Sequence, residues 1–228
     1  MRSFEEIEAL AADKKGGPDR LTALLGEHNM PKPVEDLEKI GDDRWLSMFT
    51  KCVFQAGFSW KVIEQKWSGF EEAFENFDVA RLAFLPDEAF EALLQDTRIV
   101  RNGAKIKAVQ DNAVFLKDLA REHGSASKFF AHYPASDQIG LMELMKKRGS
   151  RLGGTTGQIS LRFMGKESFI LTGDVVNALI RENVIENDRM SKKNLSAAQV
   201  AFNEWKTTSG RTMDEISRIL AFSVETSH

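Results

Sequence analysis

The sequence predicts an all-helical protein, and the spacing of its apolar residues is the main reason. Apolar residues recur every three to four positions along most of the 228 residues, which is the period of a helix, while the alternation typical of strands is almost absent. Glycine is concentrated in a few short stretches, and proline is scarce inside the patterned ones. With 42% hydrophobic residues, the chain can bury one large core or two closely packed helical lobes.

The charge balance and the single cysteine narrow the class of protein. The net charge of −3 and the isoelectric point near 5.9 count mildly against a nucleic-acid binder, although a local basic patch can create the necessary field. Because Cys52 is the one cysteine, an intramolecular disulfide and a multi-cysteine metal site are excluded. No apolar run approaches the roughly 20 residues of a bilayer span, and the acidic start is unlike a signal peptide. We therefore expect a cytoplasmic protein that does not associate with membranes.

Two short helices are predicted at the start of the chain. Residues 3–12 form the first, with Ser3 as its N-cap and Glu6 completing a capping box. A Lys-Lys-Gly-Gly-Pro-Asp break occupies residues 14–19, and the second helix covers residues 20–27.

The patterning becomes stronger from Asp42 onward. An apolar stripe there ends at Ala56-Gly57, after which Ser59 is placed to cap a helix that begins near Trp60. Further helices are predicted, in order, at 68–76, 78–83, 86–96, 101–122 and 136–148, then through Met164, and at 174–182, 195–206 and 212–223.

The most informative segment is Lys146-Lys-Arg-Gly-Ser-Arg-Leu-Gly-Gly-Thr-Thr-Gly157. Two helices joined by a tight hairpin can present backbone N–H groups to a phosphate at a helix N-terminus, and Gly153 and Gly154 carry no side chain to hold DNA away. The same letters also fit a helix C-cap followed by a loop, because basic residues suit the negative end of a helix. The expected DNA-backbone contacts are Lys146, Lys147, Arg148, Arg151, Gly153, Gly154, Thr155 and Thr156.

A resemblance to a known family covers roughly residues 42–165. The turn Gln55-Ala-Gly-Phe-Ser-Trp60 is similar to the Gln-Ala-Gly-Leu-Ser-Trp signature of bacterial 3-methyladenine DNA glycosylase I, within the helix-hairpin-helix DNA glycosylase superfamily. The agreement continues in order through Phe74 with Phe77-Asp78, Leu94-Gln-Asp96, Ile99-Val-Arg-Asn, Lys105-Ile106, Asn112-Ala113, Leu144-Met-Lys-Lys-Arg-Gly149 and Gly154-Thr-Thr156. The later Phe169-Ile-Leu-Thr-Gly-Asp-Val175 resembles the turn that follows the hairpin in the wider superfamily.

The resemblance implies an all-helical glycosylase fold of two helical lobes with a cleft between them. It implies an N-terminal helical extension at 1–41, a glycosylase core at 42–182 with the helix-hairpin-helix at 145–181, and C-terminal helices at 183–228 that pack on the core. It also implies a monomeric enzyme of base-excision repair, which hydrolyses the N-glycosidic bond of an alkylated, 3-methyladenine-like base in double-stranded DNA.

Departures from the family pattern fall at positions that carry chemistry. The family's base-reading glutamate is replaced by Cys52, and a thiol is no substitute for a carboxylate acceptor. The family's zinc ligands have no counterpart, so we expect neither a metal nor a cofactor. In the wider superfamily an aspartate after the hairpin assists cleavage. The register without gaps places Thr172 there, with Asp174 two residues later, and these are the catalytic candidates.

The expected base pocket follows from the need to extrude a base before it can be cleaved. The resemblance implies a pocket at Cys52, Phe54, Gln55 and Trp60, where an electron-poor alkylated purine would stack on an indole. The competing interpretation is an ordinary core, because Phe54 and Phe58 are four residues apart. Core packing is also the expectation for Trp45 and Trp67.

Two other functions stay open at this point. The changes at Cys52 and Thr172 are also compatible with a catalytically diverged DNA-binding protein on a glycosylase scaffold. The acidic isoelectric point alone suggests a helical protein–protein adaptor, which would lack salt-dependent DNA affinity. The sequence leaves open which modified base is excised, and whether Asp174, Glu64 or a backbone carbonyl orients the water.

Overall fold

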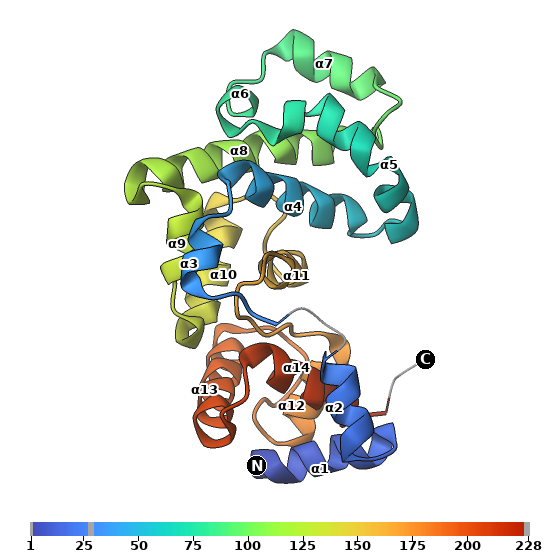
Figure 1. The fold of residues 1–228 in the computed structure, drawn as a ribbon, viewed down its shortest axis with the longest axis vertical. Helices are drawn as coiled ribbons and strands as arrows, with labels where there is room; N and C mark the ends of the chain where they lie inside the picture. Colours follow the sequence, from blue (N-terminus) through green and yellow to red (C-terminus); the bar gives the residue numbers. More distant parts are fainter. Residues whose placement is uncertain (1, 27–29, 226–228) are drawn as a thin grey trace. The chain divides into compact units, whose positions relative to one another are not determined.

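The computed structural model describes residues 2–26 and 30–225, and over these ranges the chain folds into helices and connecting loops without a strand (Figure 1). The all-helical prediction is therefore confirmed. The chain divides into two compact units that are interleaved along the sequence. One, here called the terminal unit, comprises Met1–Lys32, Pro134–Leu141 and Gly165–His228; the other, the central unit, comprises Pro33–Tyr133 and Met142–Met164. In the described part of the chain, no helix has both the length and the apolar character needed to cross a membrane.

Helix α4 is the helix around which the central unit is built, because it packs against α5, α8, α9 and α11. The helices around α4 are short or amphipathic, and each of them buries one apolar face. The helices of this unit are α3 (Val34–Glu38), α4 (Asp42–Gln55), α5 (Trp60–Ala73), α6 (Val79–Leu82), α7 (Asp87–Gln95), α8 (Gly103–His123), α9 (Ala126–His132) and α11 (Thr155–Met164), with a 3-10 turn at Glu75–Phe77. Helix α10 (Gln138–Arg148) begins in the terminal unit and ends in the central one.

Aromatic rings fill the core of the central unit. Trp45 is fully buried and stacks on Phe130, with 4.4 Å between ring centroids, while Phe49 meets both rings edge-on. The half-buried Trp67 stacks on Phe70 at a centroid distance of 5.1 Å. The expectation that Trp45 and Trp67 are core residues is confirmed.

The short helices α3 and α9 were not predicted, because each depends on contacts with distant residues. The carboxylate of Asp42 accepts hydrogen bonds from the backbone N–H groups of Ala126 (3.1 Å) and Ser127 (3.0 Å) at the start of α9. Helix α9 also packs against α3 and α8. Helices of five to seven residues are marginal by themselves, so these tertiary contacts stabilise them.

One predicted boundary is wrong for a steric reason. A new helix was expected to start at residue 68, but α5 runs unbroken from Trp60 to Ala73. A Cβ at Gly69 would lie only 2.7 Å from the carbonyl oxygen of Arg98. The glycine therefore permits close packing of a loop against α5.

The terminal unit is a second helical bundle with its own core. Phe169 stacks on Phe202 with 4.1 Å between centroids, and Ser3 forms the expected capping box with Glu6. Its helices are α1 (Phe4–Lys15), α2 (Pro18–Gly26), α12 (Gly173–Arg181), α13 (Lys192–Ser209) and α14 (Met213–Phe222). Glu27, the last residue predicted for the second helix, lies outside the described residues.

The units differ from the contiguous domains expected at 1–41, 42–182 and 183–228. Residues 165–182 group with the two ends of the chain, because the buried residues Val175 and Leu179 of α12 belong to the same core as Ile7 of α1 and Ile216 of α14. The sequence pattern identified apolar faces but did not indicate which faces pair.

Phe130→Ala should destabilise the protein by about 3–5 kcal/mol, because it opens a cavity beside Trp45, Phe49 and Phe115. The change in unfolding free energy is measured by urea denaturation. Phe84→Ala is the matched control: this phenylalanine is 72% exposed and lies near Lys117, so its loss should cost about 1 kcal/mol or less. Equal effects of the two substitutions would contradict the core assignment.

Candidate nucleic-acid interface and base pocket

A glycine-rich hairpin joins α10 to α11, and α8 holds it in place. The amide group of Asn112 on α8 donates to the Ser150 carbonyl oxygen (3.1 Å) and accepts from the Ser150 N–H (2.7 Å). Leu152 anchors the hairpin in the core with 1% of its surface exposed. The stretch expected to be a hairpin is thus a braced turn between two helices, not a loose loop after a C-cap.

Glycine is required at three positions of this hairpin, for three different reasons. Gly154 has a φ of +99°, which disfavours any residue with a Cβ. A Cβ at Gly157 would lie 2.2 Å from the Leu152 carbonyl oxygen, and one at Gly153 would lie 2.8 Å from Cγ of Lys146. Sequence reasoning did not assign a role to Gly157, and only the turn geometry reveals it.

The hairpin leads directly into the N-terminus of α11, which begins at Thr155. The first N–H groups of a helix have no intrahelical acceptor, and the helix dipole makes this end positive. Thr155 is exposed and Thr156 is half-buried, so this end of α11 suits an anion such as a phosphate.

The four basic residues expected to contact DNA are not equivalent. Lys146, Lys147 and Arg151 are exposed. Arg148 instead forms a bidentate ion pair with Glu122, with N–O distances of 2.8 and 2.7 Å. These hydrogen bonds raise the pKa of the Arg148 guanidinium and lower the pKa of the Glu122 carboxyl. The ion pair thus occupies two of the five N–H donors of Arg148 and neutralises its charge, unlike the other three basic residues.

The C-terminal end of α4 carries three of the four predicted pocket residues, and all three are buried: Cys52, Phe54 and Gln55. Phe54 is fully buried and packs edge-on against Phe70 at 4.7 Å, which fits the core interpretation of this residue. Burial raises the pKa of the Cys52 thiol from 9.0 to about 12, although the charge of Lys51 opposes the shift. The position is therefore occupied by a neutral thiol.

Gln55 has a defined orientation and one unused acceptor. Its Nε2 donates to Glu64 at 3.2 Å, and Glu64 in turn pairs with Lys51 at 2.8 Å. The Oε1 atom of Gln55 is buried and has no hydrogen-bond partner within the described chain. A buried acceptor without a partner is costly in free energy, so it suits a donor on a ligand.

Trp60 differs from the core aromatics because its side chain is 47% exposed at the start of α5. It meets Phe163 of α11 edge-to-face, with 6.1 Å between centroids and an interplanar angle of 84°. Phe163 is 42% exposed and was not singled out in the sequence, where no motif contains it. The two exposed rings bring the start of α5 and the end of α11 into contact at the surface of the central unit.

Lys105, near the start of α8, connects this pocket region to the rest of the central unit. Its Nζ donates to the carbonyl oxygens of Phe54 (3.1 Å) and Ala56 (2.7 Å) at the end of α4. Burial lowers the pKa of the Lys105 ammonium, and the positive charge of Arg151 lowers it further. Sequence reasoning quoted this lysine as part of a motif without assigning it a task.

The two catalytic candidates lie in the terminal unit, whereas the pocket candidates lie in the central unit. Thr172 is the N-cap of α12, and its hydroxyl accepts from the Val175 N–H at 3.3 Å. Asp174 lies half-buried in the first turn of the same helix. Thr172 therefore caps the helix, and of the two catalytic candidates only Asp174 carries a carboxylate.

The described residues contain no group of three or more His, Cys, Asp or Glu side chains that could hold a metal ion.

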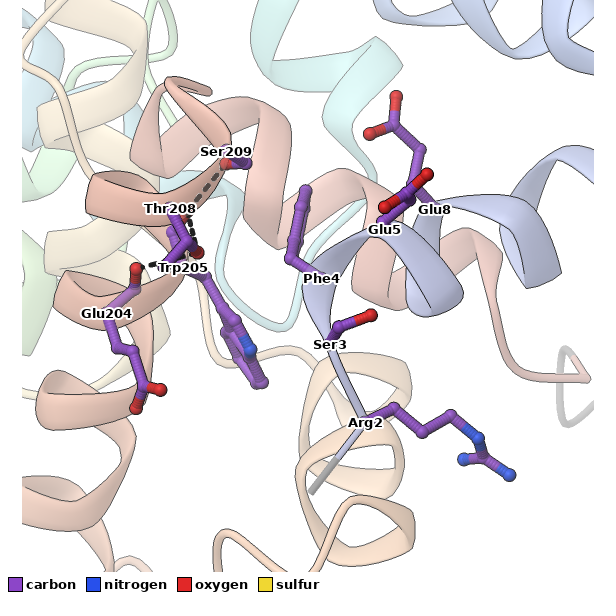
Figure 2. Close-up of a pocket in the computed structure, with 9 residues that line it drawn as sticks. All are labelled: Arg2, Ser3, Phe4, Glu5, Glu8, Glu204, Trp205, Thr208 and Ser209. Atoms are coloured by element: carbon purple, nitrogen blue, oxygen red, sulfur yellow. Dashed lines mark hydrogen bonds between the residues drawn. The ribbon is translucent and has the colours of Figure 1, made fainter.

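A surface pocket of about 440 Å³ lies between the start of α1 and the end of α13 in the terminal unit (Figure 2). Around it, Phe4 contacts Trp205 at 6.1 Å between centroids, and Glu8 pairs with Arg211. These contacts join helices of the terminal unit.

A comparison with protein families decides how the central unit is classified. Residues 37–160 match the methyladenine glycosylase family, and this range is more than half of the chain. The chain belongs to this family. The matched range of this methyladenine glycosylase family member contains the α4 end, Trp60, Lys105 and the hairpin. The resemblance expected from the sequence is confirmed.

Two named relatives of this family member share part of its length. It is 29% identical over 121 residues to DNA-3-methyladenine glycosylase 1 of Escherichia coli (strain K12), covering 45% of the chain and 64% of the relative. It is 34% identical over 59 residues to DNA-3-methyladenine glycosylase of Haemophilus influenzae, covering 26% of the chain and 32% of the relative. The chain thus spans less than two thirds of the length of these relatives.

A solved structure supports the classification at the level of the fold. The structure of 3-methyladenine DNA glycosylase I from Staphylococcus aureus is similar with a TM-score of 0.50 and 23% identity, covering 68% of this chain and 91% of the other. The family member therefore has the helical fold of these proteins, with additional residues of its own.

The buried Cys52 thiol should make stability depend on pH in a defined window. Between about pH 9 and 12 the unfolded chain releases the thiol proton that the folded chain retains, so the stability contributed by this group is complete below pH 9 and falls as the pH rises. The test compares unfolding free energies of the wild type and Cys52→Ala from about pH 7 to 11. Their difference should change steadily above about pH 9, and a constant difference would contradict the assignment.

Proposed function

We propose that this protein is a DNA glycosylase that hydrolyses the N-glycosidic bond of an alkylated, 3-methyladenine-like base in double-stranded DNA. The observation that carries this proposal is that one family match, over residues 37–160, includes both the glycine-rich hairpin and the turn from Gln55 to Trp60. We also propose that the protein acts in base-excision repair, as a monomer, in the cytoplasm. The names of the two relatives support the reaction type.

The proposed reaction begins with the grip on the DNA backbone. Phosphates bind at the N-terminus of α11 and at the exposed side chains of Lys146, Lys147 and Arg151. These contacts position the duplex but do not recognise its sequence. The enzyme then extrudes the target nucleotide, because a stacked base is out of reach.

The extruded base is bound by the exposed face of Trp60 and the acceptor of Gln55. A positively charged alkylated purine is attracted to the indole ring. The unpartnered Oε1 of Gln55 accepts a hydrogen bond from an N–H group of the base. Cys52 contributes a neutral surface. The pocket therefore recognises the base by stacking and by one hydrogen-bond acceptor, and not by a carboxylate.

Cleavage of the bond needs little acid catalysis when the base carries a positive charge. Water attacks C1′, the C1′–N bond breaks, and its electron pair neutralises the departing base. A carboxylate that accepts the proton of the water assists this step, and Asp174 in the first turn of α12 stays the catalytic candidate in the terminal unit, where Thr172 caps the helix.

A second function, DNA binding without base release, is favoured by one specific observation. The position of the family's base-reading carboxylate holds a buried thiol that stays protonated at neutral pH. The two functions agree on the hairpin and differ only in the chemistry at the pocket, so a single product analysis separates them.

Purified protein incubated with alkylated, deaminated and oxidised DNA should release a modified purine that mass spectrometry identifies. Trp60→Ala and Gln55→Ala should lower the single-turnover rate by about tenfold or more, because each removes one of the two contacts to the base. Phe84→Ala is the matched exposed-aromatic control and should leave the rate unchanged. Binding of DNA without release of any base from the three substrates would favour the diverged DNA-binding protein instead.

The affinity for undamaged duplex DNA should fall steeply with salt, because phosphate contacts release counterions. Arg151→Gln should weaken binding to all sequences alike and reduce the slope of log K against log salt by about 0.9, which corresponds to one lost phosphate contact. Lys39→Gln on α3, an exposed lysine paired with Asp36, is the control and should leave the slope unchanged. A slope near zero in the wild type would support the adaptor protein.

A further inference from the structure

The end of α4 is held by a side chain from another helix. The last carbonyl groups of a helix have no intrahelical donor and lie at its negative end. Lys105 Nζ donates to two of them, at 3.1 Å to Phe54 and 2.7 Å to Ala56. Lys105 is itself fixed at the start of α8, where its backbone N–H donates to the side chain of Asn102 at 3.1 Å.

The two carbonyl groups flank Gln55, so the lysine holds the backbone on both sides of the residue whose Oε1 has no partner. The chain then reverses at Gly57, with a φ of +69°, and the Phe58 N–H donates to the Gln55 carbonyl oxygen at 3.1 Å. This short turn leads into α5, which begins at Trp60. The position of the indole therefore depends on how the end of α4 is held.

One face of α8 holds both parts of the site. Lys105 and Asn112 are seven residues apart, two helical turns, and so they lie on the same side of the helix. Lys105 holds the Gln55 turn, whereas Asn112 holds the hairpin at Ser150. The influence of Arg151 on Lys105 agrees with this arrangement, because it requires the hairpin to lie near the Gln55 turn.

We propose that Lys105 is a positioning residue that holds the turn from Gln55 to Trp60 at a fixed position relative to the hairpin. A base extruded from a duplex that is bound at the hairpin then meets Gln55 and Trp60. The proposal rests on the proposed glycosylase function and deepens it. Lys105 acts through the backbone at the end of α4, by its charge and its two hydrogen bonds, and does not itself contact the base.

Lys105→Met removes the ammonium, whose nitrogen lies 5.8 Å from the centroid of the Phe54 ring, and keeps an unbranched apolar side chain of similar length. The single-turnover rate of base release should fall by about tenfold to a hundredfold, because a small displacement of a positioning group has that effect. The dissociation constant for undamaged DNA should stay within about a factor of two, because the phosphate contacts are unchanged. Lys105→Arg should restore most of the rate, since a guanidinium can also donate to two carbonyl oxygens. Lys107→Met, at an exposed lysine paired with Asp111 on the same helix, is the matched control and should behave as the wild type.

Hydrogen exchange of the protein alone tests the same idea without any reaction. Lys105→Met should speed the exchange of amides at 54–60 and leave those at 150–157 unchanged, whereas Lys107→Met should alter neither. Unchanged exchange at 54–60 overturns the proposal, as do an equal loss of rate and of DNA affinity, or a Lys105→Arg variant as slow as Lys105→Met. A wild type that releases no base refutes the glycosylase function, and the exchange experiment then still decides whether Lys105 holds the turn.

Discussion

Helix α4 ends among buried side chains, and Lys105 supplies the positive charge and the hydrogen-bond donors that this end requires. The rest of the site depends on that interaction. The turn at Gly57 follows immediately, and Trp60 follows the turn. On the other side, α11 packs against α4 and brings Phe163 against Trp60. The hairpin before α11 is held by Asn112, so α8 holds both the hairpin and the end of α4.

The hairpin carries a local positive charge although the chain as a whole is acidic. The net charge of −3 is an average over the whole chain, whereas Lys146, Lys147 and Arg151 concentrate positive charge at one turn. Glu122 neutralises Arg148, which leaves that side chain as a brace between α8 and α10 rather than a free contact. In the proposed function, the N-terminus of α11 and these three exposed cations bind the phosphates of the DNA backbone.

The pocket has exchanged an acidic group for a neutral one. Burial raises the pKa of the Cys52 thiol, whereas Trp60 is half exposed and the Oε1 atom of Gln55 has no hydrogen-bond partner in the described chain. Glu64 and Lys51 orient that amide by holding its Nε2 side. In the proposed function, the ring of Trp60 and the amide oxygen of Gln55 are the two contacts that would recognise an electron-poor base.

The sequence by itself determined the all-helical class, most of the longer helices, the capping box at Ser3 and the glycine-rich hairpin, because these depend on residues that are close together in the chain. It also determined the family, because several short motifs occur in the same order. Only the tertiary structure decided the pairing of Arg148 with Glu122, the grip of Lys105 on α4 and the contact of Phe163 with Trp60. It also decided that Gly69 permits close packing within a continuous helix, and that residues 165–182 join the two ends of the chain in one unit. The physical reason is the same in each case. Periodicity and local caps are encoded within a few residues, whereas the partner of a charged or aromatic side chain is set by which helix faces pack together.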